Sequence, residues 1–231
     1  MQASSARDLR LALAPYLSRS TPLAVALFLA NIAVYLAAVA SAVALDVWPA
    51  RLACAIIAGA AISALFVIGH DAAHGAYTGS RVANAVIGRV AFLPALHNYS
   101  LWQVQHNRLH HRLVNIKDFN SWSPLSKAEY DRLPPWRRWV ERLYRGPLGF
   151  APYYLIERWW RDKFFPRRRN GTSQHAIFWA DFALLLGYLA GFVVLLGLSG
   201  AALPQSSAPA AIVWGFGVPF LVWNTLMGAT T

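Results

Sequence analysis

The chain has 231 residues, of which 57% are hydrophobic and 13% are charged, and its formal net charge is +11 at pH 7. Soluble domains contain about 25% charged residues, so this composition is typical of a membrane protein and argues against a soluble one. A positive charge also occurs in nucleic-acid-binding proteins, but here it accompanies long apolar runs and no recognisable binding motif, so no nucleic-acid partner is expected.

The first two apolar runs predict a membrane hairpin. Residues 22–45 contain no charged side chain, and about 20 apolar residues suffice to cross the hydrocarbon core as a helix. This run is longer than the apolar part of a signal peptide, so we interpret it as a retained span. The second span, residues 51–70, follows the short connection DVWPAR, whose Trp48 suits the interfacial aromatic belt, and it continues without a break signal into His70.

Residues 71–176 form a long polar section with a mixed pattern. Residues 82–96 are moderately apolar but contain Arg89 and Pro94, so we expect an interfacial or re-entrant segment. Residues 136–169 alternate aromatic side chains with Arg and Lys, a pattern that favours helices lying in the lipid headgroup plane over a soluble basic loop.

Two further apolar runs, residues 177–198 and 210–227, predict a second hairpin. The first of them contains one charge, Asp181, near its start. The sequence therefore predicts an all-α, integral membrane, single-domain fold over residues 1–231. Four transmembrane helices form two hairpins, and cytoplasmic and interfacial helices carry the clustered histidines described below.

The basic residues predict the orientation of these spans. Three of the 21 Lys and Arg residues precede the first span, seventeen lie between Arg81 and Arg169, and Arg51 alone falls in a loop on the opposite side. Cytoplasmic loops are enriched in Lys and Arg. Both termini and the polar section are therefore expected in the cytoplasm.

Five of the seven histidines occur in two clusters, and they are the candidate metal ligands. HDAAH contains His70 and His74, whereas HNRLHH contains His106, His110 and His111. A spacing of four residues places two side chains on one face of a helix. Imidazole nitrogens suit iron, copper, zinc or nickel, and ionisable groups that cluster at a membrane edge usually have a function.

Three neighbouring residues are candidates for supporting roles. Asp71 and Asn107 each follow the first histidine of a cluster, and metal-bound imidazoles usually donate their second N–H to a carboxylate or carbonyl. For Asp71 the alternative is a charge at a helix end in the interface. His97 is a weaker candidate for touching the site.

HDAAH followed by HNRLHH, placed after a membrane hairpin, resembles the first two histidine boxes of the membrane fatty acid desaturase family. The flanking residues are most similar to acyl-lipid desaturases of the omega-6 or delta-12 type. These flanks are Pro94, Tyr99, Ser100 and Trp102 before the second box, and NSWSPLSKAEYDRLP (120–134) after it. The resemblance covers nearly the whole chain.

The resemblance implies a non-haem di-iron (Fe) centre that uses O2 and two electrons to introduce a double bond into an acyl chain. The acyl-lipid substrate would lie in the membrane, and a ferredoxin or cytochrome-type protein would supply the electrons. The basic cytoplasmic surface is consistent with docking of an acidic donor, and equally with attraction to anionic lipid headgroups.

The sequence departs from the family pattern in one respect. The family carries a third histidine box after its fourth span, whereas here the fourth span is followed only by the last residues of WNTLMGATT. We therefore expect a C-terminally truncated chain that lacks ligands for two irons and has no desaturase activity alone.

Two alternatives remain open at the level of sequence. One is a carotenoid ketolase or hydroxylase, or an alkane hydroxylase, with the same histidine boxes. The other is a non-enzymatic membrane metal-binding protein or transporter. Transporters place ligands near the bilayer midplane, and these spans contain almost none.

Overall fold

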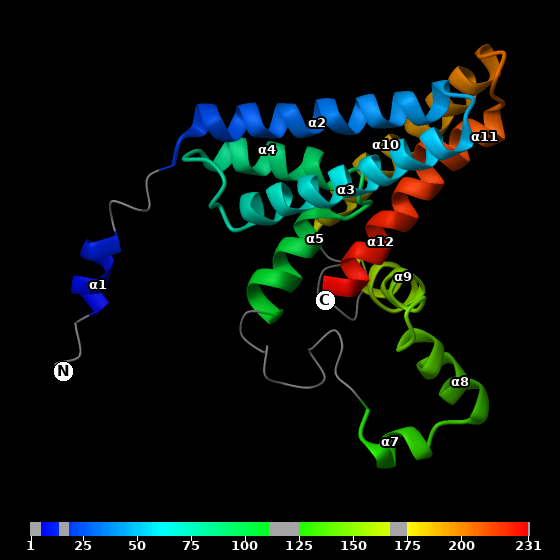
Figure 1. Ribbon diagram of the computed structural model, residues 1–231. Coiled ribbons are helices and arrows are strands. Elements are labelled where there is room, and N and C mark those ends of the chain that lie inside the picture. The colour runs from blue at the N-terminus through cyan, green and yellow to red at the C-terminus, as the bar shows by residue number, and fades with distance from the viewer. Residues whose placement is uncertain (1–5, 14–18, 111–124, 167–174, 231) are drawn as a thin grey trace.

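The computed structural model describes residues 6–13, 19–110, 125–166 and 175–230, and this part of the chain is helical with no strand (Figure 1). Four of its helices are long and apolar enough to cross a membrane. They lie where the four spans were predicted, which confirms the all-α membrane fold. Their bounds are Thr21–Ala44, Trp48–Ala73, Ala176–Ala202 and Ala208–Thr230.

The first hairpin consists of α2 (Thr21–Ala44) and α3 (Trp48–Ala73), which run side by side in Figure 1. The second helix begins three residues before the predicted span. Trp48, expected in the connection, is its first residue, and Pro49 occupies the first turn, where a missing N–H costs no helical hydrogen bond.

Helix α3 lies at the centre of the bundle and packs against α2, α4 (Arg81–Phe92) and α12 (Val218–Thr230). Two glycines allow these close approaches. A Cβ at Gly59 would lie 2.6 Å from the side chain of Val222 on α12, and a Cβ at Gly69 would overlap the ring of Phe92 on α4. The missing side chain at Gly69 therefore allows α4 to pack closely against the end of α3 that carries the first histidine cluster.

The second hairpin consists of α10 (Ala176–Ala202) and a continuous helical segment built from α11 (Ala208–Ile212), the π-helical η6 (Val213–Gly217) and α12. The loops of the two hairpins meet at the end of the bundle opposite the histidines. Arg51 donates to the carbonyl oxygens of Leu45 and, at 3.2 Å, Gln205, and the Gln205 amide donates to Ala44 at 2.7 Å. Arg51 thus connects the two loops by donating to a backbone carbonyl in each of them.

The polar section folds into short helices. They are α4, α5 (Tyr99–Val104), the π-helical η2 (Gln105–His110), α7 (Lys127–Asp131), α8 (Pro135–Tyr144), α9 (Phe150–Tyr153) and the π-helical η4 (Tyr154–Lys163). A further helix, α1 (Ala6–Leu13), lies near the N-terminus. The helices predicted within residues 136–169 are present, and their position in the headgroup plane stays a prediction.

The segment at residues 82–96, expected to be interfacial or re-entrant, is helix α4 followed by a turn. Arg89 on α4 forms an ion pair with Asp181 on α10, with Nε 2.7 Å from Oδ1. The other oxygen of Asp181 accepts from the backbone N–H of Ser100, at the start of α5, at 2.9 Å. This buried carboxylate therefore joins α4, α5 and α10, and it accounts for the one charge in the third span.

Candidate metal centre

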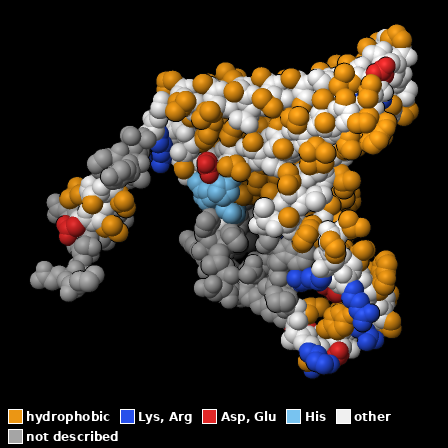
Figure 2. Space-filling model, viewed as in Figure 1, with side chains coloured by type: hydrophobic (Ala, Val, Ile, Leu, Met, Phe, Trp, Pro, Cys, Tyr) orange, Lys and Arg blue, Asp and Glu red, His pale blue; other side chains and the backbone are white. Residues whose placement is uncertain are grey.

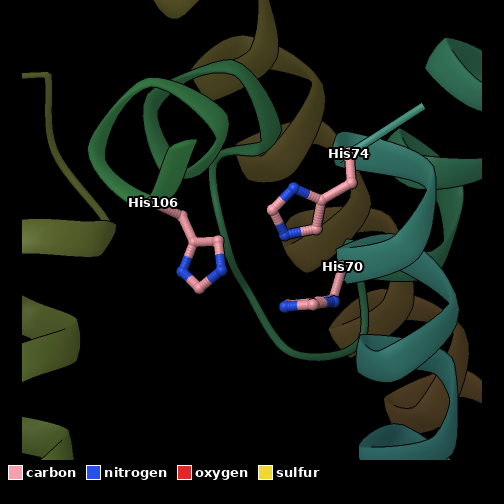
Figure 3. Close-up of side chains that lie close together, drawn as sticks. All are labelled: His70, His74 and His106. Atoms are coloured by element: carbon pink, nitrogen blue, oxygen red, sulfur yellow. The ribbon is translucent and has the colours of Figure 1, made fainter. Parts of the chain in front are cut away.

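Three histidines from two separate helices converge at one end of the bundle (Figure 3). His70 and His74 come from the C-terminal end of α3, and His106 comes from η2. One ring nitrogen of each lies within 4.8 Å of those of the other two. The ring centroids are 4.6 Å apart for the first pair, 4.9 Å for His70 and His106, and 5.1 Å for His74 and His106.

The end of α3 places the first two histidines. The helix continues through His70 to Ala73, so the two side chains lie one turn apart on the same face. His74 is the C-cap residue, and Gly75 follows with a φ of 67°. A glycine in the left-handed region is the common way to end a helix, so the chain turns away immediately after the second histidine.

Two side-chain amides hold the second box against the first. The Nδ2 of Asn107 and the Nε2 of Gln103 both donate to the carbonyl oxygen of Ala73, at 3.1 and 2.8 Å. The last carbonyls of a helix have no partner within the helix, so Ala73 offers an acceptor next to His74. Asn107, expected beside a metal-bound imidazole, acts in this structure through the backbone of α3.

An aromatic side chain packs directly on the cluster. The ring of Trp102 stacks on that of His106, with centroids 4.2 Å apart and planes 16° apart, and it contacts His70 edge-on at 5.4 Å. Trp102 precedes His106 by one helical turn. Its spacing of four residues from His106 could have marked it as part of the site, although it was expected only to flank the second box.

Asp71 lies in the position expected of a carboxylate that accepts a hydrogen bond from a metal-bound imidazole. Its Oδ1 is 2.9 Å from Nδ1 of His70, and both side chains are partly exposed. With the proton on Nδ1, His70 donates to this carboxylate and presents the Nε2 lone pair to an ion.

His97 has different surroundings from the three converging histidines. It is 2% exposed, its Nδ1 is 2.7 Å from the carbonyl oxygen of Ala95, and its Nε2 is 3.0 Å from the hydroxyl of Tyr154. Burial lowers the pKa of His97 to about 3, so the ring is neutral, donates from Nδ1 and accepts at Nε2. Both ring nitrogens of His97 therefore form hydrogen bonds within the protein.

The remaining histidines of the second box are only partly described. His110 is the last residue of η2, but its side chain and the whole of His111 lie outside the described residues. Their role as ligands stays a prediction.

A second set of contacts fixes the start of η2. Gln105 donates to the carbonyl oxygen of Asp162 at 2.7 Å and accepts from Nζ of Lys163 at 2.8 Å. Burial lowers the pKa of Lys163 to about 7. The helix that carries His106 is thus attached both to α3 and to η4, elements that precede and follow it in the sequence.

Comparison with known proteins identifies the family. The model of the fatty acid desaturase family matches residues 46–230. The chain belongs to this family. This membership and the four apolar helices together make it an integral membrane protein.

Several curated desaturases are similar to this family member. The sn-1 oleoyl-lipid 12-desaturase of Picosynechococcus is 32% identical over 101 residues, 44% of this chain and 29% of that relative. The sn-1 acyl-lipid omega-3 desaturase (ferredoxin) of Synechocystis is 35% identical over 105 residues, 45% and 28% of the two chains. The chloroplastic omega-6 fatty acid desaturase of Glycine max is 32% identical over 101 residues, which are 44% of this chain and 23% of that relative. The match spans less than a third of each of these relatives.

The three converging imidazoles of this chain provide a nitrogen donor set for a common metal ion. Ligand nitrogens about 2.0–2.1 Å from one ion lie about 3.4 Å apart in tetrahedral geometry, and here the nitrogens lie within 4.8 Å of one another. Binding of one ion would therefore require the rings to rotate toward one another. Nitrogen donors with one carboxylate nearby suit a transition metal rather than magnesium or calcium.

Proposed function

We propose that this chain contributes the iron site of an acyl-lipid desaturase, which introduces a double bond into an acyl chain using O2 and two electrons. The observation that carries the proposal is the convergence of His70, His74 and His106 in a chain that matches the desaturase family. The flanks of the second box favour acyl lipids over carotenoids or alkanes as substrates.

Five histidines are proposed as iron ligands, namely His70, His74, His106, His110 and His111. The family's di-iron group, when bound, supplies the oxidising power with O2 that removes hydrogens from an unactivated acyl chain, a reaction beyond side-chain acids and bases. The protein's part is to hold these ligands and to position the chain.

The neighbouring residues have distinct proposed roles. Asp71 accepts a hydrogen bond from the Nδ1–H of His70 and so keeps the Nε2 lone pair of that ring available to an ion. Trp102 covers one face of His106 and limits its rotation. His97 is not proposed as a ligand, because both of its ring nitrogens bond to the protein.

The orientation and the partners are also proposals. By sequence, 20 of the 21 Lys and Arg residues fall in segments expected to face the cytoplasm. That side carries the histidine cluster, whose side chains gather at the surface in Figure 2. An electron donor of ferredoxin or cytochrome type would approach from there; one relative has ferredoxin in its name.

Lipid profiling of cells that express the complete gene encoding this chain tests the proposal. We expect acyl chains with one additional double bond, which disappear in His106→Ala and persist in His97→Gln. A new hydroxyl or keto group would instead support a hydroxylase or ketolase. Bound metal with unchanged lipids would contradict an enzymatic role.

A further inference from the structure

We propose that helix α8 docks on the surface of an anionic lipid bilayer through an exposed apolar face. This α8 face consists of Trp136, Trp139 and Leu143 on the helix and Leu148 just after it. This face does not include the histidine cluster, and its docking does not depend on the proposed enzymatic function.

The position of the charged side of α8 indicates that its apolar side is turned outward. Arg137 lies 2.8 Å from Glu157 on η4 and 3.0 Å from Glu141 within α8, and it lies over the ring of Tyr144. Both glutamates are at least 87% buried, with side-chain exposures of 11% and 13%. This network attaches the charged side of the helix to the rest of the protein.

The opposite side of α8 is apolar and exposed. Trp136, Trp139 and Leu143 follow the spacing i, i+3, i+7 and so share one helical face. Their exposures are 67%, 65% and 41%, and Leu148 is 86% exposed. A globular protein in water would bury such a face, and a contiguous exposed apolar patch marks an interaction surface.

The chemistry around this face favours a lipid surface as its partner. Arg132, Arg142 and Arg145 are exposed along the same stretch, and Figure 2 shows hydrophobic and basic side chains intermixed over this part of the molecule. Tryptophan prefers the boundary between headgroups and acyl chains, and each arginine near an anionic leaflet gains binding energy from the surface potential.

The four candidate spans also favour a bilayer over another protein. They keep the chain in a membrane, so a lipid surface is always available to a helix of the same chain. An interfacial helix of this kind combines one apolar face with flanking basic residues, which is the pattern of α8.

A fluorescence-quenching experiment in nanodiscs tests this proposal. The full chain carries one native cysteine, Cys54, which is replaced by serine. An environment-sensitive label is then attached at Leu143→Cys or, in a second variant, at Leu148→Cys. The matched control is Ala128→Cys, an exposed position on α7 outside the α8 face. Quenching by nitroxide-labelled lipid is compared with quenching by aqueous iodide, in zwitterionic bilayers and in bilayers with anionic lipid.

We expect lipid quenching at position 143 or 148 to exceed that at position 128 by about twofold or more, because an interfacial helix is buried about 5–10 Å into the headgroup boundary. Replacing Arg132, Arg142 and Arg145 together by Gln should reduce this excess in anionic bilayers. Equal lipid quenching at the two labelled positions and at 128 would overturn the proposal. Protection at 143 and 148 from both quenchers would also overturn it, because a protein partner or a second copy would then cover the face.

Discussion

His97 and His106 lie nine residues apart in the sequence, and their imidazole rings have opposite surroundings. His97 is buried, with one nitrogen bonded to a backbone carbonyl and the other to Tyr154. His106 is partly exposed, stacks on Trp102, and directs a nitrogen toward those of His70 and His74. A ring whose nitrogens are both occupied by the protein stabilises the fold, whereas rings that converge near solvent are suited to bind an ion.

The largest expected effect comes from removing one converging ring. His106→Ala should weaken binding of Co²⁺ to the full chain by more than about 100-fold. Loss of a residue that only hydrogen-bonds to a metal ligand typically weakens metal binding by about 10- to 100-fold. His97→Gln should leave the affinity unchanged. Equilibrium titration followed by the visible Co²⁺ spectrum measures both variants, and equal losses in the two would remove the distinction between these histidines.

A smaller effect is expected when the two boxes lose their amide contacts. Gln103→Ala or Asn107→Ala should weaken Co²⁺ binding by about 10-fold, because the donors to Ala73 fix the position of His106 relative to His74. Gln103→Glu keeps the shape but loses the donor, so it should resemble Gln103→Ala.

Asn31→Ala is the matched control for these variants. It removes a 2.9 Å amide-to-carbonyl bond within α2 and should not change the affinity. If it weakens Co²⁺ binding as much as the Gln103 variant, general loss of stability would explain both results.

Tyr154→Phe should affect stability without affecting the metal site. The change leaves Nε2 of His97 buried without its hydroxyl partner, which costs about 1–3 kcal/mol of unfolding free energy. Tyr130→Phe removes the hydroxyl that accepts an exposed hydrogen bond from Arg142, and it should lower the free energy of unfolding clearly less. Denaturant unfolding in detergent gives both values; a change in Co²⁺ affinity in Tyr154→Phe would connect His97 to the site after all.

The smallest expected effect is a pH dependence of stability caused by His97. Its pKa is about 3 in the folded chain, below its usual 6.5, so between these values the unfolded state binds more protons. Stability should therefore fall as the pH falls, with a contribution of about 1 kcal/mol per pH unit from this residue. The slope between pH 6 and 5 should be shallower in His97→Gln, and identical slopes would show that His97 is not held neutral.

The sequence was sufficient to predict the spans and the pairing of the first two histidines. Long apolar runs and the spacing of His70 and His74 both follow from local helical geometry. The meeting of the two clusters was also expected, because a membrane hairpin and a family resemblance place both at one end of the bundle.

Other contacts leave no pattern in the sequence. The acceptor for Gln103 and Asn107 is a backbone carbonyl, which every residue has, so nothing near Ala73 marks it. Arg89 and Asp181 are 92 residues apart, and their pairing depends on how α4 packs against α10. The outward apolar face of α8 likewise depends on where Glu157 lies in the folded chain.

X-ray absorption of the iron-loaded full chain tests the central claim, that His70, His74 and His106 hold one ion, most directly. The claim predicts imidazole nitrogens at about 2.0–2.2 Å from iron, close to the distances of other divalent metals. It further predicts that imidazole scattering falls in His106→Ala and stays unchanged in His97→Gln. An iron spectrum without imidazole scattering, or one that His106→Ala leaves unaltered, would contradict it.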